Sequence, residues 1–313
     1  MIYKKRLIIL ITIIAALTIT YAVSLIFSYG IGSGSSVYAW LDSKSAARVT
    51  RIILNAEEQE FEIVKKTNQW FVLYNNFEYP ARQVRIDDFL QIFTTRSAWP
   101  VRSSSNSTHE RFGVDENASR VTIYGEYSVL MDVLLGHDDI FRNETYIRRT
   151  GQNEVRSGDR SIKMYLSGPV SSWYNLRLIP ESENGNLDID GVQKLTVFDG
   201  RTTLNFNRRS RVWELTGANV ENPSMNNIEH YIRFIINLEG DNFVDDVLRD
   251  DPVLNSNRLT LELGNGRVIT IRISDEDETG KRLAHVSGRE YVYSIPSWSA
   301  GRIFRDASSF EMQ

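Results

Sequence analysis

The longest uninterrupted hydrophobic pattern of the chain lies near its N-terminus. Residues 7–29 carry no charged side chain, follow Lys4, Lys5 and Arg6, and precede a Gly/Ser-rich segment. As a helix this run would be about 34 Å long, enough to cross a hydrocarbon core of about 30 Å. The pattern therefore predicts a cytoplasmic basic tail over 1–6, a transmembrane helix over 7–29 and a linker over 30–46.

A cleaved signal peptide is the alternative for this segment. Its apolar region usually has about 7–15 residues and ends in a small-x-small site. The best candidate site, Val37-Tyr38-Ala39, has valine at its first small position. We therefore favour a retained signal anchor, which predicts a single-pass protein of the cytoplasmic (inner) membrane. Its N-terminus would lie inside and its large C-terminal part would be extracytoplasmic.

Short alternating runs follow the linker. Apolar positions recur over 49–54, 61–63 and 70–72, and polar segments typical of turns separate these runs. Such runs predict an antiparallel meander. Residues 86–95 then place apolar side chains three and four positions apart, with acidic residues at the start, which predicts one amphipathic helix.

The second half of the chain repeats this order. Val49 and Trp70 are twenty-one positions apart, and so are Val192 and Trp213. A helical pattern over 225–238 follows the second tryptophan, and strand-like runs resume in both halves. The sequence thus predicts an α+β protein with two tandem, duplicated units over 47–184 and 185–313, each a mainly antiparallel sheet with a packed helix.

Composition narrows the possible functions. The chain contains no cysteine, which excludes disulfides, thiolate metal sites and cysteine nucleophiles. Its formal net charge of −4 provides no basic field for nucleic acid. The densest basic segment, which contains Arg208, Arg209 and Arg211, is more typical of a solvated turn than of a phosphate-binding patch.

Several segments resemble one protein family. They are Trp70-x-Val72 and the segments 111–115, 121–123, 134–136, 145–149 and 154–155. With Phe112 in place of a tyrosine and Val114 in place of a leucine, the first half is similar to the domain of unknown function 4340. That family occurs in membrane-tethered proteins encoded near ABC exporters of the gliding-motility type. The resemblance implies an extracytoplasmic accessory of a transporter and supplies no established active site.

A search for catalytic or metal-binding patterns finds little. His109, His137, His230 and His285 are isolated from one another, so no zinc motif exists. The acidic segments at 136–139 and 275–278 are more typical of solvated turns than of cation loops. The segment Gly32-Ser33-Gly34-Ser35-Ser36 only approximates a Gly-x-Ser-x-Gly pattern, and a flexible tether cannot hold an oxyanion hole. We predict no catalytic residue, no metal site and no cofactor.

Four tryptophans are the remaining candidates, either as caps of the core or as contacts to a partner. Trp70 and Trp213 recur at equivalent positions, and Trp173 and Trp298 are expected to correspond near the ends of the two units. A tryptophan on a strand more often closes a core, whereas an exposed one is favoured at protein interfaces.

Two functions of different class remain open. The first is a membrane-anchored, non-enzymatic accessory whose partner is an ABC transporter permease or a related membrane complex. The alternative is a periplasmic or surface enzyme that acts on an envelope polymer.

Overall fold

The computed structural model describes residues 17, 18, 21, 37–56, 59–179, 187–218 and 220–312. The chain divides into two compact units, Met1–Trp173 and Tyr174–Gln313, so the boundary lies earlier than the expected one after residue 184. The transmembrane helix expected over 7–29 lies outside the described residues, apart from 17, 18 and 21. Within the described part of the chain, no helix has both the length and the apolar character needed to cross a membrane.

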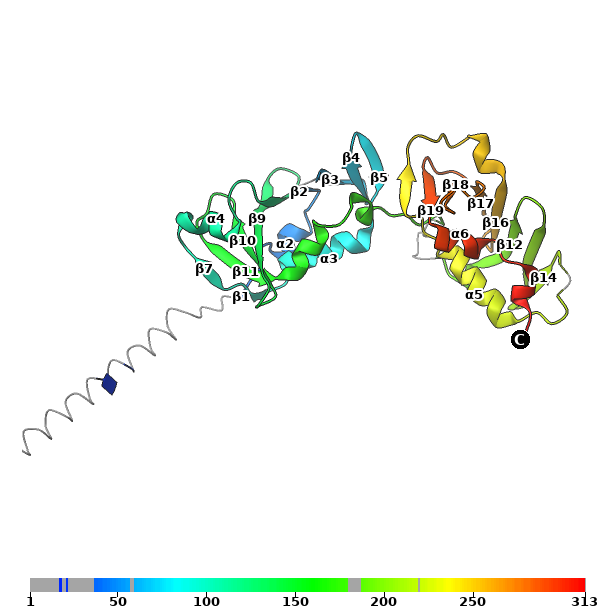
Figure 1. Cartoon of the computed structure of the whole chain (residues 1–313), viewed down its shortest axis with the longest axis horizontal. Helices are drawn as coiled ribbons and strands as arrows, with labels where there is room; N and C mark the ends of the chain where they lie inside the picture. The colour runs from blue at the N-terminus through cyan, green and yellow to red at the C-terminus, as the bar shows by residue number, and fades with distance from the viewer. Residues whose placement is uncertain are drawn as a thin grey trace, which may run out of the picture. The chain divides into compact units, whose positions relative to one another are not determined.

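Unit 1 is built on a nine-stranded sheet whose neighbouring strands are all antiparallel (Figure 1). The strand order is β5-β4-β3-β2-β8-β9-β10-β11-β7. In chain order the strands are β2 (Arg51–Ala56), β3 (Gln59–Lys66), β4 (Gln69–Tyr74), β5 (Phe77–Pro80), β7 (Val101–Ser103), β8 (Ser119–Tyr124), β9 (Val129–Asp139), β10 (Glu144–Arg149) and β11 (Val155–Asp159).

The main helix of unit 1 confirms the amphipathic pattern. It is α3 (Gln83–Thr94), which begins a few residues before the predicted range and buries Ile86, Phe89 and Phe93. Shorter elements complete the unit, namely β1 (Val37–Tyr38), β6 (Ser97–Ala98), α2 (Ser43–Ala46), α4 (His109–Phe112) and the 3₁₀ segments η1 (Asn106–Thr108), η2 (Arg160–Tyr165) and η3 (Val170–Trp173).

The linker expected over 30–46 is too long. β1 pairs with β6, and α2 is capped by the Asp42 carboxylate. Trp40 and Leu41 are buried in the core of unit 1. Burial of these two apolar side chains explains why this segment belongs to the fold of unit 1.

Unit 2 contains an eight-stranded antiparallel sheet in the order β14-β13-β12-β16-β17-β18-β19-β15. Its elements are η4 (Ile189–Gly191), β12 (Val192–Phe198), β13 (Thr203–Arg209), β14 (Val212–Thr216), α5 (Met225–Ile236), β15 (Asn242–Val244), η5 (Pro252–Asn255), β16 (Asn257–Leu263), β17 (Val268–Ile273), β18 (Arg282–Val286), β19 (Val292–Ile295), α6 (Ser297–Ile303) and η6 (Ala307–Phe310).

The helix predicted over 225–238 is confirmed as α5, which starts at the predicted residue and ends two residues earlier. The Ser224 side chain accepts a hydrogen bond from the amide of Asn227 and so caps the helix. Its buried face consists of Ile228, Tyr231, Ile232, Ile235 and Ile236. These positions are three and four apart, as the sequence pattern requires.

The two sheets share one order of connections once β5 is set aside. In both units, the first strand of the sheet in chain order, β2 or β12, lies between the second strand, β3 or β13, and a later strand, β8 or β16. A short strand that follows the main helix and precedes β8 or β16 in the chain, namely β7 or β15, pairs at the far edge with the last strand, β11 or β19. The α+β prediction is therefore confirmed.

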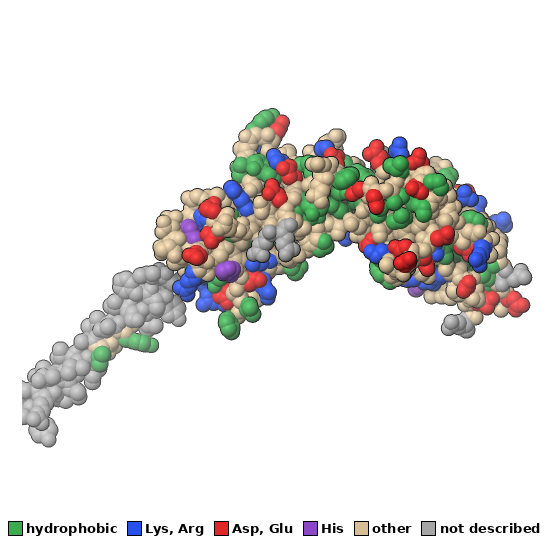
Figure 2. All heavy atoms as spheres, turned by 45° about the horizontal axis from the view of Figure 1, so that its top comes forward, with side chains coloured by type: hydrophobic (Ala, Val, Ile, Leu, Met, Phe, Trp, Pro, Cys, Tyr) green, Lys and Arg blue, Asp and Glu red, His purple; other side chains and the backbone are tan. Residues whose placement is uncertain are grey.

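Figure 2 shows acidic and basic side chains interspersed over the drawn face, which is consistent with the small net charge of the chain.

Candidate functional site

Four of the segments that carry the family resemblance, 111–115, 134–136, 145–149 and 154–155, meet around one buried arginine. This residue is Arg148, which lies on β10 and whose side chain is only 3% exposed. Its Nε donates to the Val114 carbonyl at 2.7 Å, its Nη1 to the Gln152 carbonyl at 3.0 Å and its Nη2 to Glu116 Oε1 at 3.0 Å. The guanidinium thus fastens the segment after α4 to the sheet.

Two glycines allow α4 to approach the sheet so closely. Gly113 ends α4 with a φ of 64°, in the left-handed region that favours glycine. A Cβ on Gly136 would lie 2.1 Å from the backbone oxygen of Phe112. The Phe112 and Tyr146 rings then pack with their centroids 4.6 Å apart. These motif residues therefore hold α4 on the sheet.

A second cluster holds the N-terminal segment of unit 1, and we name it the aromatic clasp: Tyr38, Trp40, Trp99, Arg149 and Arg156. Arg149 donates from Nε to the Tyr38 hydroxyl at 2.9 Å and from Nη2 to the Trp40 carbonyl at 2.5 Å. The Trp40 and Trp99 rings meet edge to face at 5.4 Å. Arg156 donates to the Trp99 carbonyl at 2.7 Å and lies 4.9 Å from the Tyr38 ring centroid. The clasp makes the segment after residue 36 an integral part of unit 1.

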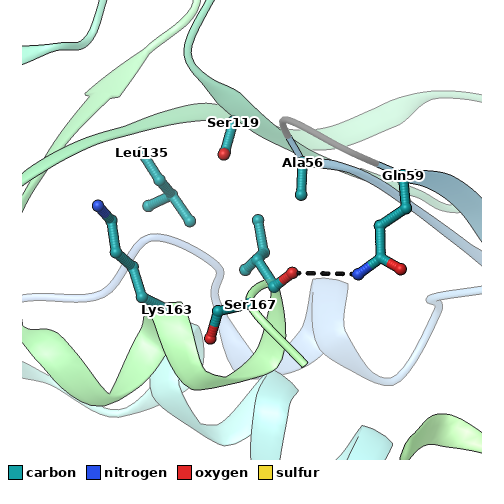
Figure 3. A pocket seen from close by; sticks show the side chains of 7 residues that line it. Ala56, Gln59, Ser119, Leu135, Lys163 and Ser167 are labelled. Carbon is teal, nitrogen blue, oxygen red and sulfur yellow. Dashed lines mark hydrogen bonds between the residues drawn. The ribbon is translucent and has the colours of Figure 1, made fainter. Parts of the chain in front are cut away.

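A hollow of about 290 Å³ opens beside Ala56 at the end of β2 and Gln59 at the start of β3 in unit 1 (Figure 3). It is lined by Ala56, Gln59, Ser119, Leu135, Lys163, Leu166 and Ser167. The Gln59 amide donates to the Leu166 carbonyl at 3.4 Å and to the Gly168 carbonyl at 2.7 Å. Lys163 Nζ lies 3.4 Å from an Asp138 carboxylate oxygen. The described lining offers hydroxyls, one amide and one ammonium group, all of which can form hydrogen bonds.

A larger hollow of about 790 Å³ lies on unit 2, where the β13–β14 turn and α5 contribute Arg208, Arg211, Trp213, Glu229 and Arg233. Arg208 is only 13% exposed and forms an ion pair with Asp190, and Arg233 lies 3.4 Å from the Asp188 carboxylate. The basic segment thus contains a hairpin turn, as expected. Because two of its cations have carboxylate partners, the hollow presents a mixed charge pattern.

His285 lies within unit 2 on β18 and is 7% exposed. Arginine can only donate, so the 3.1 Å contact from Arg272 Nη2 makes His285 Nδ1 the acceptor. His285 Nε2 therefore carries the proton and donates to the Arg289 carbonyl at 2.9 Å. Burial lowers the pKa of His285, and the nearby guanidinium of Arg272 lowers it further. The ring is thus a neutral structural group.

The segment 136–139, expected as a solvated turn, instead belongs to β9. Cross-strand pairs of Asp138 with Thr145 and of Asp139 with Glu144 continue the ladder with β10. Partial burial disfavours the Asp138 carboxylate, but hydrogen bonds from Thr145 and Arg160 lower its pKa. In the second acidic segment, the Asp277 carboxylate accepts bonds from Thr279 and Lys281, as in an ordinary turn. Among the described residues, no three His, Cys, Asp or Glu side chains are placed to hold a metal ion.

Three of the four candidate tryptophans lie in the cores. Trp70 is 6%, Trp213 3% and Trp173 0% exposed. Trp298, on α6, is 68% exposed. The first three therefore stabilise the fold through burial, and Trp298 is the member of the set that is available to a partner.

The expected correspondence between Trp173 and Trp298 is wrong. Trp173 packs on Phe61 and Phe89, and its carbonyl accepts a hydrogen bond from the Arg82 amide at the start of α3. In unit 2, Phe310 occupies this place. It packs on Phe206 and Tyr231, and its carbonyl accepts from the Ser224 amide at the start of α5.

Comparisons with known proteins give one match. A family model described as "Domain of unknown function (DUF4340)" matches residues 70–257, more than half of the chain. This region begins in β4 of unit 1 and ends at β16 of unit 2. No curated protein and no solved structure matches. The chain belongs to the DUF4340 family.

Proposed function

We propose that this protein is a membrane-anchored, extracytoplasmic accessory of an ABC-type transporter, which binds the permease or an exported substrate without catalysis. The observation that carries the proposal is the aromatic clasp. It joins Tyr38 and Trp40 to β10 and β11, so the folded part of unit 1 includes the chain at Tyr38.

The clasp limits the distance between unit 1 and the membrane. Seven residues, 30–36, separate the apolar run from Val37. Seven residues span at most about 25 Å even when fully extended. With residues 7–29 as the anchor, unit 1 therefore stays close to the membrane surface, where the extracytoplasmic loops of a permease lie. An enzyme acting on a distant envelope polymer would need a longer reach.

We also infer that the two units are copies of one ancestral unit. The matching strand order supports this inference, and so do equivalent contacts within each unit. Lys65 pairs across the strands with Trp70 and lies 5.7 Å from its ring centroid. Arg208 pairs with Trp213 and lies 6.0 Å from its ring centroid. Two similar units in tandem are suited to binding one partner at two sites. Once the first unit has bound, the second unit is held at a high effective concentration near its own site, which raises the overall affinity.

The test is recovery of the partner from the native membrane. Full-length tagged protein is gently solubilised, and co-purifying proteins are identified by mass spectrometry. We expect a permease or its associated ATPase. The matched control carries about thirty extra Gly/Ser residues after Ser36, which leaves the clasp intact but releases unit 1 from the surface. We expect this control to recover much less permease.

Three results would contradict the proposal. One is equal recovery of permease by the control, because proximity would then be irrelevant. Another is full protection of both units when protease is added to intact spheroplasts. The third is hydrolysis of envelope polymer by the purified full chain, which would favour the enzymatic alternative.

A further inference from the structure

We propose that the turn between β9 and β10 rests in the lipid–water interface of the membrane, with Ile140 and Phe141 as the inserted side chains. This inference rests on the membrane anchoring proposed above and adds a second contact between unit 1 and the bilayer.

The turn exposes two adjacent apolar side chains. Ile140 is 75% and Phe141 is 102% exposed. Two neighbouring hairpin turns of the same sheet are polar at their tips, with Thr67-Asn68 after β3 and Asn75-Asn76 after β4. Polar residues are the rule at exposed turns because water solvates them without cost. A protruding Ile-Phe pair is therefore a feature that calls for an apolar environment.

The turn lies at the end of unit 1 that also holds Val37. A short series of contacts connects Val37 to the turn. Val37 pairs with Ala98, and the next residue, Trp99, packs against Gly158. Gly158 in turn pairs with Thr145, which lies close to the turn in sequence. Figure 1 shows β1 and the lower ends of β10 and β11 together at one end of the unit. With at most about 25 Å between an anchor and Val37, this end of the unit would face the bilayer.

The charges at the base of the turn permit such an approach. Asp139 lies 3.9 Å from Arg142, and Asp138 lies 2.8 Å from Arg160. Because these carboxylates have cationic partners, they do not present a net negative field to a lipid surface. Attraction then comes from the two apolar side chains, and binding should change little with salt or with the charge of the lipid.

The test uses the natural absence of cysteine from the chain. Ile140→Cys introduces one labelling site for an environment-sensitive fluorophore. Tyr127→Cys is the matched control, because Tyr127 is 89% exposed but precedes β9 whereas Ile140 follows it. The eleven residues of β9 separate the two sites by roughly 35 Å. Each full-length labelled protein is reconstituted into phosphatidylcholine vesicles containing lipids with a nitroxide near the headgroup.

We expect a blue shift and strong quenching of the label at position 140, and neither change at position 127. Adding Phe141→Asp to Ile140→Cys should abolish most of the quenching while leaving the circular dichroism spectrum unchanged. Absence of quenching at position 140 in protein that floats with the vesicles would overturn this inference alone. Failure of the protein to float would instead overturn the anchoring on which it rests.

Discussion

Replacing Arg148 by methionine isolates the contribution of the buried guanidinium. Methionine keeps the length of the apolar stem, so the change removes chiefly the three hydrogen bonds to Val114, Gln152 and Glu116. The Val114 carbonyl is then buried without a donor, which costs about 1–3 kcal/mol. The Gln152 carbonyl lies nearer to solvent and loses one ordinary hydrogen bond, about 1 kcal/mol. We expect the free energy of unfolding of unit 1 to fall by about 2–4 kcal/mol.

Native-state hydrogen exchange read by mass spectrometry provides the assay, because it reports the opening of unit 1 separately from that of unit 2. Peptides covering α4 and β10 should lose protection in Arg148→Met. The control is Glu116→Gln, which changes a side chain that is 73% exposed and should cost less than about 0.5 kcal/mol. Equal exchange in Arg148→Met and in the wild type would refute the structural role of this arginine. An equal loss in both variants would show that the ion pair, and not the carbonyl contacts, dominates.

Three further predictions follow from the packing. Gly158→Ala should destabilise unit 1 by about 1–3 kcal/mol in denaturant titration, because the new Cβ would lie 1.9 Å from the Trp99 ring; a stability equal to that of the wild type would contradict this contact. Trp70→Ala and Trp213→Ala should each cost about 3–5 kcal/mol in their own units, and a variant that keeps its melting temperature while losing its partner would show a contact role. The pKa of His285 is lower in the fold than its unfolded value of about 6.5, so its stabilisation is full above that pH and is lost as the pH falls towards the folded value. The stability difference between wild type and His285→Asn should therefore shrink between pH 7 and pH 5, and a constant difference would contradict the neutral assignment.

The strands and main helices could be predicted from sequence because their signals are local. In β2, Ile52 and Leu54 are buried between less buried neighbours, so the alternation was already visible in the chain. The first residue of α3 could not be predicted from the local sequence. The helix begins at Gln83, where the Trp173 carbonyl, ninety-one positions away, accepts from the Arg82 amide. No pattern near residue 83 contains that partner.

Elements that depend on distant partners were missed for the same reason. Trp40 belongs to the core because Arg149 and Trp99 hold it, and neither residue is near it in sequence. Position near the end of each unit likewise did not identify equivalent residues, since Phe310, and not Trp298, makes in unit 2 the contacts that Trp173 makes in unit 1. The arginines of the candidate site were visible as a motif. They point in opposite directions because side chains alternate along a strand, but the partners that they reach on each face lie far away in sequence.

Those opposite directions connect the two clusters of unit 1. Successive residues of a strand point to opposite faces of its sheet, so Arg148 holds α4 on one face while Arg149 holds the N-terminal segment on the other. The same strand, β10, begins directly after the turn that carries Ile140 and Phe141. A single tether would let a folded unit swivel freely, whereas a second contact through this turn would restrict its orientation. With both proposed contacts in place, β10 would transmit that restraint to the whole sheet, and unit 1 would present one fixed surface to a neighbouring permease.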